Sequence, residues 1–304
     1  MYFLSYEEHK YVTRKLLPEA RRNEVHPDLR GWNWMQPPLA PIYDHIRIGI
    51  SDIASLYCPT SRDLYLKKVM KVGFKANKEM VEGLILHRII SHAFTLAKRI
   101  LFNIKEISGA VFSREFGDLD LDDFILDDER EKLIPEIEKR ARLIWEFEKT
   151  RIAYRIDDIK SRYPYCEKDA FVFLVLPVIV EQRLNGIFLG LSPNLAVDGY
   201  IFSEGMVVDV KFDPIEKDFH KLAFTGYAMV MESLYEFPVD LGSMVYVRFQ
   251  NEEIRIKREF HHISDELRQW FIEERDRKMH MLENETDPGK QECYDICPYK
   301  EFCP

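Results

Sequence analysis

Two acidic residues and a lysine occupy neighbouring segments in the second half of the chain. Asp198 ends a short apolar run, and Asp209 and Lys211 follow it within a strand-like segment. Side chains two residues apart on a strand share one face, so Asp209 and Lys211 would point the same way. Two converging carboxylates suit Mg²⁺ or Mn²⁺, and the lysine can act on phosphate charge or on a metal-bound water. The pattern predicts metal-assisted phosphodiester hydrolysis, although an Asp-x-Lys tripeptide is also common on ordinary strand surfaces.

Four of the five cysteines form a second group with metal-binding chemistry. Cys58 lies early in the chain, and Cys293, Cys297 and Cys303 lie close to its end. Four thiolates make a soft site that binds an iron–sulfur cluster or Zn²⁺ and not Mg²⁺. The gaps fit a zinc ribbon poorly, because ribbons use paired Cys-x-x-Cys motifs. We therefore predict a clasp, defined as these four cysteines around one metal site, in which Cys166 takes no part; free structural thiols are the alternative.

The composition describes a globular protein with a sizeable core, since 46% of the residues are hydrophobic and 31% are charged. A net charge of −9 disfavours a nucleic-acid coat protein. It does not disfavour a nuclease, whose metal-binding carboxylates add negative charge, but phosphate contact then requires a local patch. The densest basic group is Lys67, Lys68, Lys71 and Lys75, which we predict to contact DNA, with an ordinary solvated face as the alternative.

The chain shows no segment typical of a membrane or exported protein. No apolar run reaches the length of a transmembrane helix, and residues 1–15 lack the apolar centre of a signal peptide. We therefore expect a cytoplasmic protein without a membrane partner. Cysteines in that compartment argue against a disulfide framework, which favours metal binding by the thiols.

Apolar periodicity predicts the elements that must position these residues. Helical and strand-like segments follow one another in an order that indicates a mixed α/β core in one elaborated domain. We expect an irregular aromatic arm at residues 1–44 and a helical insertion at about residues 105–165. Within it, the acidic residues 109–131 should form a loop or an insertion. One expected helix begins at Ser51, and the others span residues 78–102, 131–160, 220–234 and 263–282. The expected strands span residues 170–180, 187–191, 196–202, 206–212, 243–250 and 253–260.

The order of these elements resembles the PD-(D/E)xK nuclease superfamily in its RecB-like branch. That family places a histidine on an early helix, then an aspartate, then an Asp/Glu-x-Lys strand, then a helix with a Gln-x-x-x-Tyr motif. The matching residues are His87, Asp198, Asp209, Lys211 and Tyr227. Two positions depart from the pattern, because Ala223 stands in place of the glutamine and Leu195 in place of a glycine.

The resemblance implies roles for the matching residues. His87, Asp198, Asp209 and the backbone carbonyl of Val210 would hold the catalytic metal. Lys211 would act on the attacking water, and Tyr227 would complete the catalytic set. Ala223 removes a polar group that usually lies near a DNA phosphate, and the neighbouring His220 and Lys221 are its candidate replacements.

RecB-like nucleases with one cysteine before the nuclease motifs and three after them form an iron–sulfur subset. This chain resembles one group within it, the CRISPR-associated RecB-like exonucleases of the fourth CRISPR-associated family, and its aromatic arm favours their archaeal Apern-type branch. The resemblance covers residues 45–304, with cluster-binding ends around Cys58 and at residues 285–304. It implies a 4Fe-4S cluster in preference to zinc, and an exonuclease that uses Mg²⁺, Mn²⁺ or cobalt.

The same resemblance implies a substrate and partners. Members of the group act on single-stranded DNA ends or overhangs and trim prespacers, with the CRISPR integrase proteins as partners; self-association stays open. Two other functions also stay open. A non-catalytic module that recognises DNA ends is favoured by Ala223, and an iron–sulfur electron carrier would leave the Asp-x-Lys strand without a purpose. Cleavage of DNA with added Mn²⁺ separates these alternatives.

Overall fold

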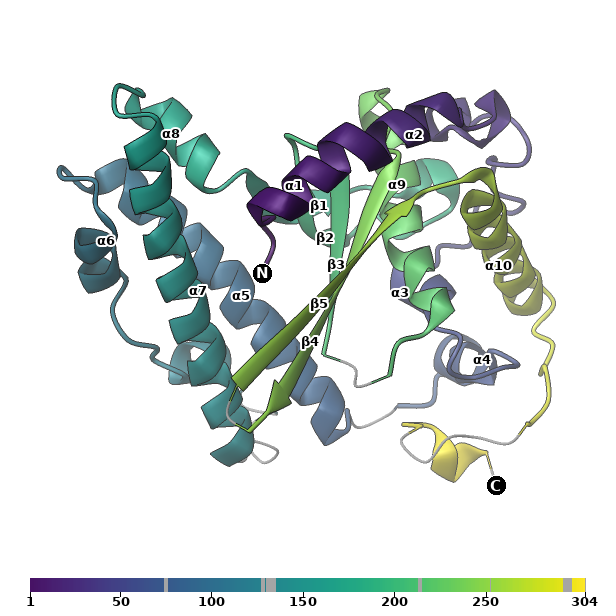
Figure 1. The fold of residues 1–304 in the computed structure, drawn as a ribbon. Coiled ribbons are helices and arrows are strands. Elements are labelled where there is room, and N and C mark those ends of the chain that lie inside the picture. The colour runs from purple at the N-terminus through teal and green to yellow at the C-terminus, as the bar shows by residue number, and fades with distance from the viewer. Residues whose placement is uncertain are drawn as a thin grey trace.

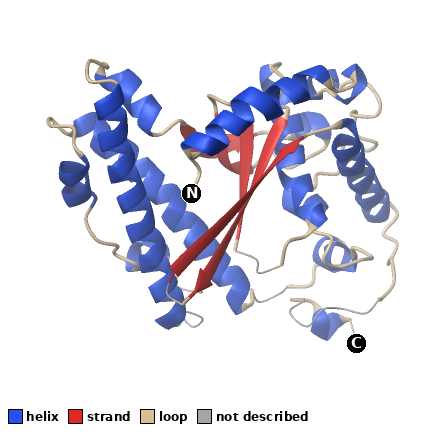
Figure 2. Ribbon diagram, in the orientation of Figure 1, coloured by secondary structure: helices blue, strands red, loops and turns tan. Residues whose placement is uncertain are grey.

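The computed structural model describes residues 1–73, 76–126, 129, 135–212, 215–251, 253–291 and 297–303. A central sheet carries helices on both of its faces (Figures 1 and 2). This arrangement confirms the predicted mixed α/β core. Within these residues, no helix combines the length and the apolar character that a membrane span requires.

The described strands form one five-stranded sheet in the order β1-β2-β3-β4-β5. Neighbouring strands are antiparallel, except that β3 and β4 run parallel. A parallel pair needs a crossover connection, which helix α9 provides. The long β4–β5 hairpin crosses the molecule diagonally (Figure 1). The strands are β1 (Val178–Leu184), β2 (Leu195–Ile201), β3 (Met206–Lys211), β4 (Leu241–Gln250) and β5 (Glu253–His262).

Most of the predicted helices are confirmed to within a few residues at their ends, apart from the predicted start at residue 131, which lies outside the described residues. The first turn of α5 is capped by the Asn77 side chain, which accepts a hydrogen bond from the Met80 N–H at 2.8 Å. The helices of eight or more residues are α5 (Lys78–Asn103), α6 (Gly109–Phe116), α7 (Pro135–Arg162), α8 (Lys168–Val175), α9 (Lys221–Tyr235) and α10 (Asp265–Glu283). The shorter α-helices are α1 (Tyr6–Tyr11), α2 (Leu17–Arg22), α3 (Ile50–Ala54) and α4 (Arg62–Lys68).

The two faces of the sheet carry separate hydrophobic cores. In β3, Val208 and Val210 pack into the core that contains α5 and α7. Val207 packs into the opposite core, which contains α9, α3 and α10. Because side chains alternate along a strand, Asp209 and Lys211 face the α9 side. The predicted catalytic strand is therefore held by apolar packing on both faces.

Residues 170–180 are not the buried strand that we predicted. They form α8 and the connection to β1, which begins at Val178. In α8, Phe171, Val172 and Val175 are buried, whereas Phe173 is exposed. That spacing is helical. Because the apolar run in the sequence is continuous, the helical period could not be recognised there. A further prediction is wrong, because residues 187–191 contain a 3₁₀ turn (Ile187–Leu189) instead of a strand. The acidic segment begins with a helix, α6, and so is not a loop throughout.

The N-terminal arm is more regular than predicted. Residues 6–22 form α1, a π-helical stretch and α2, and the Ser5 and Glu8 side chains make a capping box at their start. Before them, Tyr2 is buried, and its ring meets Phe94 of α5 edge-on at 5.1 Å. The predicted helix start at Ser51 is also shifted, because α3 begins at Ile50. Residues of the arm thus belong to the hydrophobic cores.

A buried charge network fixes the rest of the arm to α9 and α10. The Glu232 carboxylate accepts hydrogen bonds from Arg30 at 2.9 Å and from Arg268 at 2.7 and 2.9 Å. It also accepts the Gly31 N–H at 2.8 Å. A Cβ atom at Gly31 would lie 2.1 Å from the Met229 carbonyl oxygen, so this close approach requires glycine. Two arginines compensate the buried carboxylate, so removal of either one would leave its charge only partly compensated.

Candidate active site and cysteine site

The predicted nuclease residues come together at one end of the sheet, between the two helical layers. His87 comes from α5, Asp198 from β2, and Asp209 with Lys211 from β3. The His87 Nδ1 atom lies 3.7 Å from the Asp198 Oδ2 atom. The Lys211 Nζ atom lies 2.7 Å from the Asp209 Oδ2 atom. Val210 enters the site through its backbone N–H, which donates to Asp198 Oδ2 at 2.8 Å.

Burial sets the electrostatics of the two carboxylates. Asp209 is only 5% exposed, and burial raises its pKa. The charge of Asp198 acts in the same direction, whereas Lys211 and His87 act in the opposite one. Because the ionised form of Asp209 is costly here, a positive charge at the site is needed to stabilise it.

Tyr227 lies on the α9 side of the same carboxylates. Burial raises the pKa of its phenol, and the charges of Asp209 and Asp198 raise it further. The hydroxyl therefore keeps its proton and can serve as a hydrogen-bond donor near the site. On the α5 side, the Phe212 ring meets the His87 ring edge-on, with 5.2 Å between their centroids, and so restricts its orientation.

The donor set agrees in kind with a hard divalent cation. Two carboxylates and an imidazole meet beside a strand backbone, and Mg²⁺ and Mn²⁺ take mainly oxygen ligands. As placed, Asp209 pairs with Lys211, and Asp198 accepts from Val210. Among the described residues, no three His, Cys, Asp or Glu side chains are arranged to hold a metal ion. Cation binding at this position would therefore require the Asp209–Lys211 pair to rearrange.

A further carboxylate near the site, that of Glu181, was not predicted from the sequence. The β1–β2 register pairs Val180 with Gly199 and Gln182 with Val197, so Glu181 lies opposite Asp198. Its φ of +49° is a left-handed value that glutamate rarely adopts in a strand. Partial desolvation raises its pKa, and Asp198 raises it further, while His87 lowers it. Glu181 thus belongs to the electrostatic surroundings of the predicted site.

A buried hydroxyl near these carboxylates was also missed. Tyr2 is 1% exposed, and its hydroxyl has no hydrogen-bond partner among the described residues. Its ring lies against β2, because a Cβ atom at Gly199 would come within 2.8 Å of it. Burial raises the pKa of this phenol, and Asp198 and Glu181 are the next causes. No local sequence signal connects residue 2 with residue 199.

His220 and Lys221, the candidate replacements for the missing glutamine, differ in how accessible they are to a DNA phosphate. Ala223 is itself buried in α9. His220 is 3% exposed, and its two ring nitrogens lie 2.9 Å from the Tyr57 hydroxyl and 3.2 Å from the Tyr246 hydroxyl. It is therefore engaged inside the protein and cannot take over a phosphate contact. Lys221 pairs with Asp218 at the surface, at 3.0 Å, and is the more accessible of the two.

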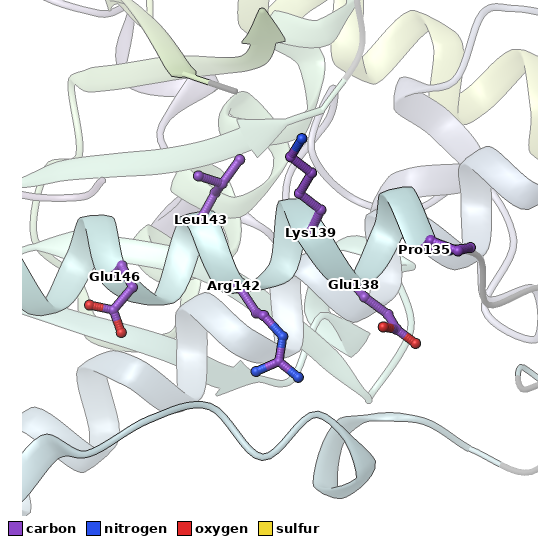
Figure 3. Close-up of a pocket in the computed structure, with 6 residues that line it drawn as sticks. All are labelled: Pro135, Glu138, Lys139, Arg142, Leu143 and Glu146. Atoms are coloured by element: carbon purple, nitrogen blue, oxygen red, sulfur yellow. The ribbon is translucent and has the colours of Figure 1, made fainter. Parts of the chain in front are cut away.

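A separate open depression of about 390 Å³ lies on the surface of α7. Figure 3 shows that its lining side chains project from this one helix. It has none of the predicted catalytic residues, and a single exposed helix face does not enclose a ligand. We do not assign it a function. Its lining residues are Pro135, Glu138, Lys139, Arg142, Leu143 and Glu146.

The two ends of the predicted cysteine clasp lie side by side. The helix that we expected from Ser51 onward ends before Cys58, which lies in the turn between α3 and α4. Arg62, at the start of α4, pairs with Asp287 at 2.8 Å and donates to Cys303 Sγ at 3.0 Å. Thr60 donates to the Gly289 carbonyl at 3.0 Å. The segment around Cys58 is therefore tied to the C-terminal tail, which runs past α4 (Figure 1).

The cysteines themselves differ in their surroundings. Cys58 and Cys297 are buried, and Cys303 is partly buried; Cys297 and Cys303 pack with Leu66 of α4. Cys293, the fourth predicted ligand, lies outside the described residues. Cys166 lies between α7 and α8 and packs against the other core. The four-cysteine clasp therefore stays a prediction, and Cys166 lies apart from the other described cysteines.

The predicted basic patch lies on and after α4. Lys67 pairs with Asp52 at 2.6 Å, whereas Lys68 and Lys71 are exposed. Lys75 lies outside the described residues. The pairing reduces the free positive charge of the patch, so its contact with DNA stays a prediction.

Comparison with known proteins identifies relatives along nearly the whole chain. The family described as "CRISPR-associated exonuclease Csa1" matches residues 1–304, including residues 1–44, where the motifs gave no resemblance. The chain is 30% identical over 284 residues to the CRISPR-associated exonuclease Csa1 of Saccharolobus solfataricus, with 92% of each chain covered. It is 28% identical over 281 residues to the protein of the same name from Thermoproteus tenax, again with 92% of each covered. No solved structure matches the chain.

Proposed function

Because the chain belongs to the family of CRISPR-associated exonucleases named Csa1, we propose that it is a divalent-metal-dependent nuclease that shortens DNA from its ends. The observation that carries the proposal is the convergence of His87, Asp198 and the Asp209–Lys211 pair from three separate elements. The sequence order of a RecB-like nuclease requires this convergence. An ordinary surface Asp-x-Lys would have no reason to meet a helical histidine and a second aspartate.

Each residue of the predicted site would have its own role in phosphodiester hydrolysis, which follows from its surroundings. A bound Mg²⁺ or Mn²⁺ would polarise a phosphate oxygen and lower the pKa of a water. His87, Asp198, Asp209 and the Val210 carbonyl are the groups that would hold it. Lys211 brings positive charge to the phosphate, where negative charge develops. Tyr227 keeps its proton and could donate a hydrogen bond from the α9 side.

The proposed substrate and setting are those that the sequence resemblance implies. We infer that the substrate is a single-stranded DNA end or overhang and that the product is a trimmed prespacer for the CRISPR integrase proteins. The clasp would bind an iron–sulfur cluster, most simply 4Fe-4S, and hold the Cys58 turn against the C-terminal tail. Its thiolates are soft ligands, so its role is structural and separate from hydrolysis.

Exonuclease activity can be tested directly with end-labelled DNA. Purified protein should shorten a linear single-stranded oligonucleotide in Mn²⁺, and EDTA should stop the reaction. A circular single strand of similar composition should stay intact, because it has no end. Cutting of the circle would contradict an exonuclease and support an endonuclease instead.

A second candidate is a DNA-end-binding module without catalysis, which the buried Ala223 in place of glutamine favours. The same experiment separates the two functions. Linear DNA that binds the protein but keeps its length in Mn²⁺, Mg²⁺ and Co²⁺ would support the module. Measurable shortening in any of these ions excludes it.

The basic patch predicts a dependence of DNA binding on salt. Changing Lys67, Lys68, Lys71 and Lys75 to Gln should weaken binding and lower the salt slope by about 0.7 per lost phosphate contact. We expect a total change of about 2, because Lys67 is already paired with Asp52. The measurement is single-stranded DNA affinity at several salt concentrations.

The control removes the same number of positive charges from other exposed positions. Lys10, Lys15, Lys105 and Lys139 are exposed and lie elsewhere in the chain. Their replacement by Gln should leave the slope nearly unchanged. If both variants alter the slope equally, the effect comes from net charge and the patch has no special role.

A further inference from the structure

Two cations of the β4–β5 hairpin share the face of the sheet that carries Lys211. The strand registers pair Lys211 of β3 with Tyr246 of β4, and Tyr246 with Lys257 of β5. Arg248 follows Tyr246 by two residues on β4, so its side chain lies on the same face. Strand geometry puts the Cα atoms of Lys211 and Arg248 about 8 Å apart. A DNA strand that reacts beside Lys211 would therefore bring a neighbouring phosphate to Arg248 and Lys257.

This face of the hairpin is open to solvent within the part of the chain that the structure describes. The opposite face packs against the core that contains α5 and α7, through Phe249, Ile254 and Ile256. The tip of the hairpin lies beside α7 (Figure 1). On the open face, the side chains of Lys257 and Arg248 are 51% and 35% exposed. Both cations can therefore be reached from solvent.

The Glu216 carboxylate is held between these two cations. Its Oε1 atom accepts a hydrogen bond from Arg248 at 2.8 Å, and its Oε2 atom accepts one from Lys257 at 2.5 Å. The hydrogen bond from Lys257 and the charges of both cations lower the pKa of Glu216, so the group is an anion at neutral pH. An arginine and a lysine that grip one anionic group are also suited to a phosphate.

Glu216 fills this position incompletely. Its two oxygens are divided between the two cations, and the Arg248 Nε atom, although buried, has no hydrogen-bond partner among the described residues. A phosphate has more acceptor oxygens and can take both N–H groups on one side of the guanidinium. A buried donor without a partner calls for an explanation, which a bound phosphate would supply. Lys257 is also shared with Glu259 at 2.7 Å, so Arg248 would make the larger contribution.

We propose that Arg248 and Lys257 form a binding site for a phosphate of the single-stranded DNA, next to the reacting phosphate, and that Glu216 occupies this site when DNA is absent. This inference rests on the proposed nuclease function. An incoming strand would displace the Glu216 carboxylate, so the DNA and this side chain compete for the same two cations. Removal of a cation and removal of Glu216 should therefore change DNA affinity in opposite directions.

The test is the affinity for a fluorescently labelled single-stranded oligonucleotide, measured by anisotropy in EDTA so that no cleavage occurs. Arg248→Gln should weaken binding by about ten-fold, because it removes charged hydrogen bonds to a phosphate. It should also lower the salt slope by about 0.7, the value for one phosphate contact. Glu216→Gln should bind about two- to five-fold more tightly, because no ion pair has to be broken. If both variants bind more weakly, the contact only supports the fold, and the inference is wrong.

Matched controls come from ion pairs on α7. Arg162 pairs with Asp158 at 2.9 Å, and Glu146 pairs with Lys149 at 3.2 Å. Arg162→Gln and Glu146→Gln make the same charge changes away from the hairpin, and DNA affinity should stay within about two-fold of the unmodified protein. If Glu146→Gln tightens binding as much as Glu216→Gln, the gain comes from net charge and the competition is rejected. The melting temperature should hardly change in any of these variants, because partly exposed ion pairs contribute little to stability.

Cleavage by the unmodified protein separates this inference from the proposed function. If the protein shortens linear DNA in Mn²⁺ while Arg248→Gln and Glu216→Gln bind DNA as it does, the function stands and the phosphate site is rejected. If the unmodified protein neither binds nor cleaves DNA, the proposed function fails, and the inference fails with it.

Discussion

Asp209→Asn should lower DNA cleavage by at least about a thousand-fold, and Lys211→Met should lower it by about a hundred-fold or more. Asp209 is the deepest carboxylate of the site, and Lys211 lies 2.7 Å from it. The first change removes a predicted metal ligand, and the second removes positive charge beside the phosphate. Initial rates on end-labelled single-stranded DNA in saturating Mn²⁺ measure both effects.

The stability of Asp209→Asn should change in the opposite sense to its activity. Burial raises the pKa of Asp209, so its ionised form is less stable in the folded chain than in the unfolded one. At pH values above the pKa that Asp209 has in the unfolded chain, the carboxylate therefore lowers the free energy of unfolding. A neutral amide of the same size removes that cost, and Lys211 is exposed enough to be hydrated without its partner. Denaturation should show an unchanged or slightly increased free energy of unfolding.

A matched Asp–Lys pair supplies the control. Asp218 and Lys221 form an ion pair at 3.0 Å, but Asp218 is 88% exposed at its side chain. Asp218→Asn should therefore alter neither cleavage nor stability appreciably. Cleavage at the unmodified rate in Asp209→Asn would remove Asp209 from the catalytic set. Equal losses in both aspartate variants would point to a general effect of charge.

The predictable part of the site is the part that local sequence patterns encode. The strand around Asp209 alternates apolar residues, and α5 repeats them at helical spacing, so each element was predicted in its observed place. The order of motifs then suggested that His87 and Asp198 meet Lys211. The structure places them together because β2 and β3 form a hairpin and α5 covers the adjoining face.

The unpredicted part depends on contacts that no local pattern records. Glu181 faces Asp198 only through the β1–β2 register, and the apolar run before it was misread as a strand that ended too early. Tyr2 reaches β2 from the other end of the chain. Register and long-range packing are decided by tertiary structure, so neither residue could be assigned to the site from sequence spacing.

Cys58→Ser and Cys297→Ser should each lose the metal of the clasp and lower thermal stability at the same time. A cluster that binds the folded chain stabilises it by mass action, by about 3 kcal/mol at a hundred-fold excess over its dissociation constant. For a chain of this size we expect a decrease in Tm of about 5–10 °C. Protein purified without oxygen, with its iron and zinc counted and its visible spectrum recorded, gives the metal content of each variant.

Cys166→Ser is the control, because Cys166 lies between α7 and α8, away from the C-terminal tail. It should keep both metal and Tm. The contacts of Arg62 with Asp287 and Cys303 already join the two ends of the chain, so the Cys58 variant should lose the metal without losing the fold. Cleavage should then fall only as far as stability does, because the nuclease residues lie on other elements. Full metal content in Cys58→Ser would show that the turn before α4 contributes no ligand, and the cluster would belong to the tail alone.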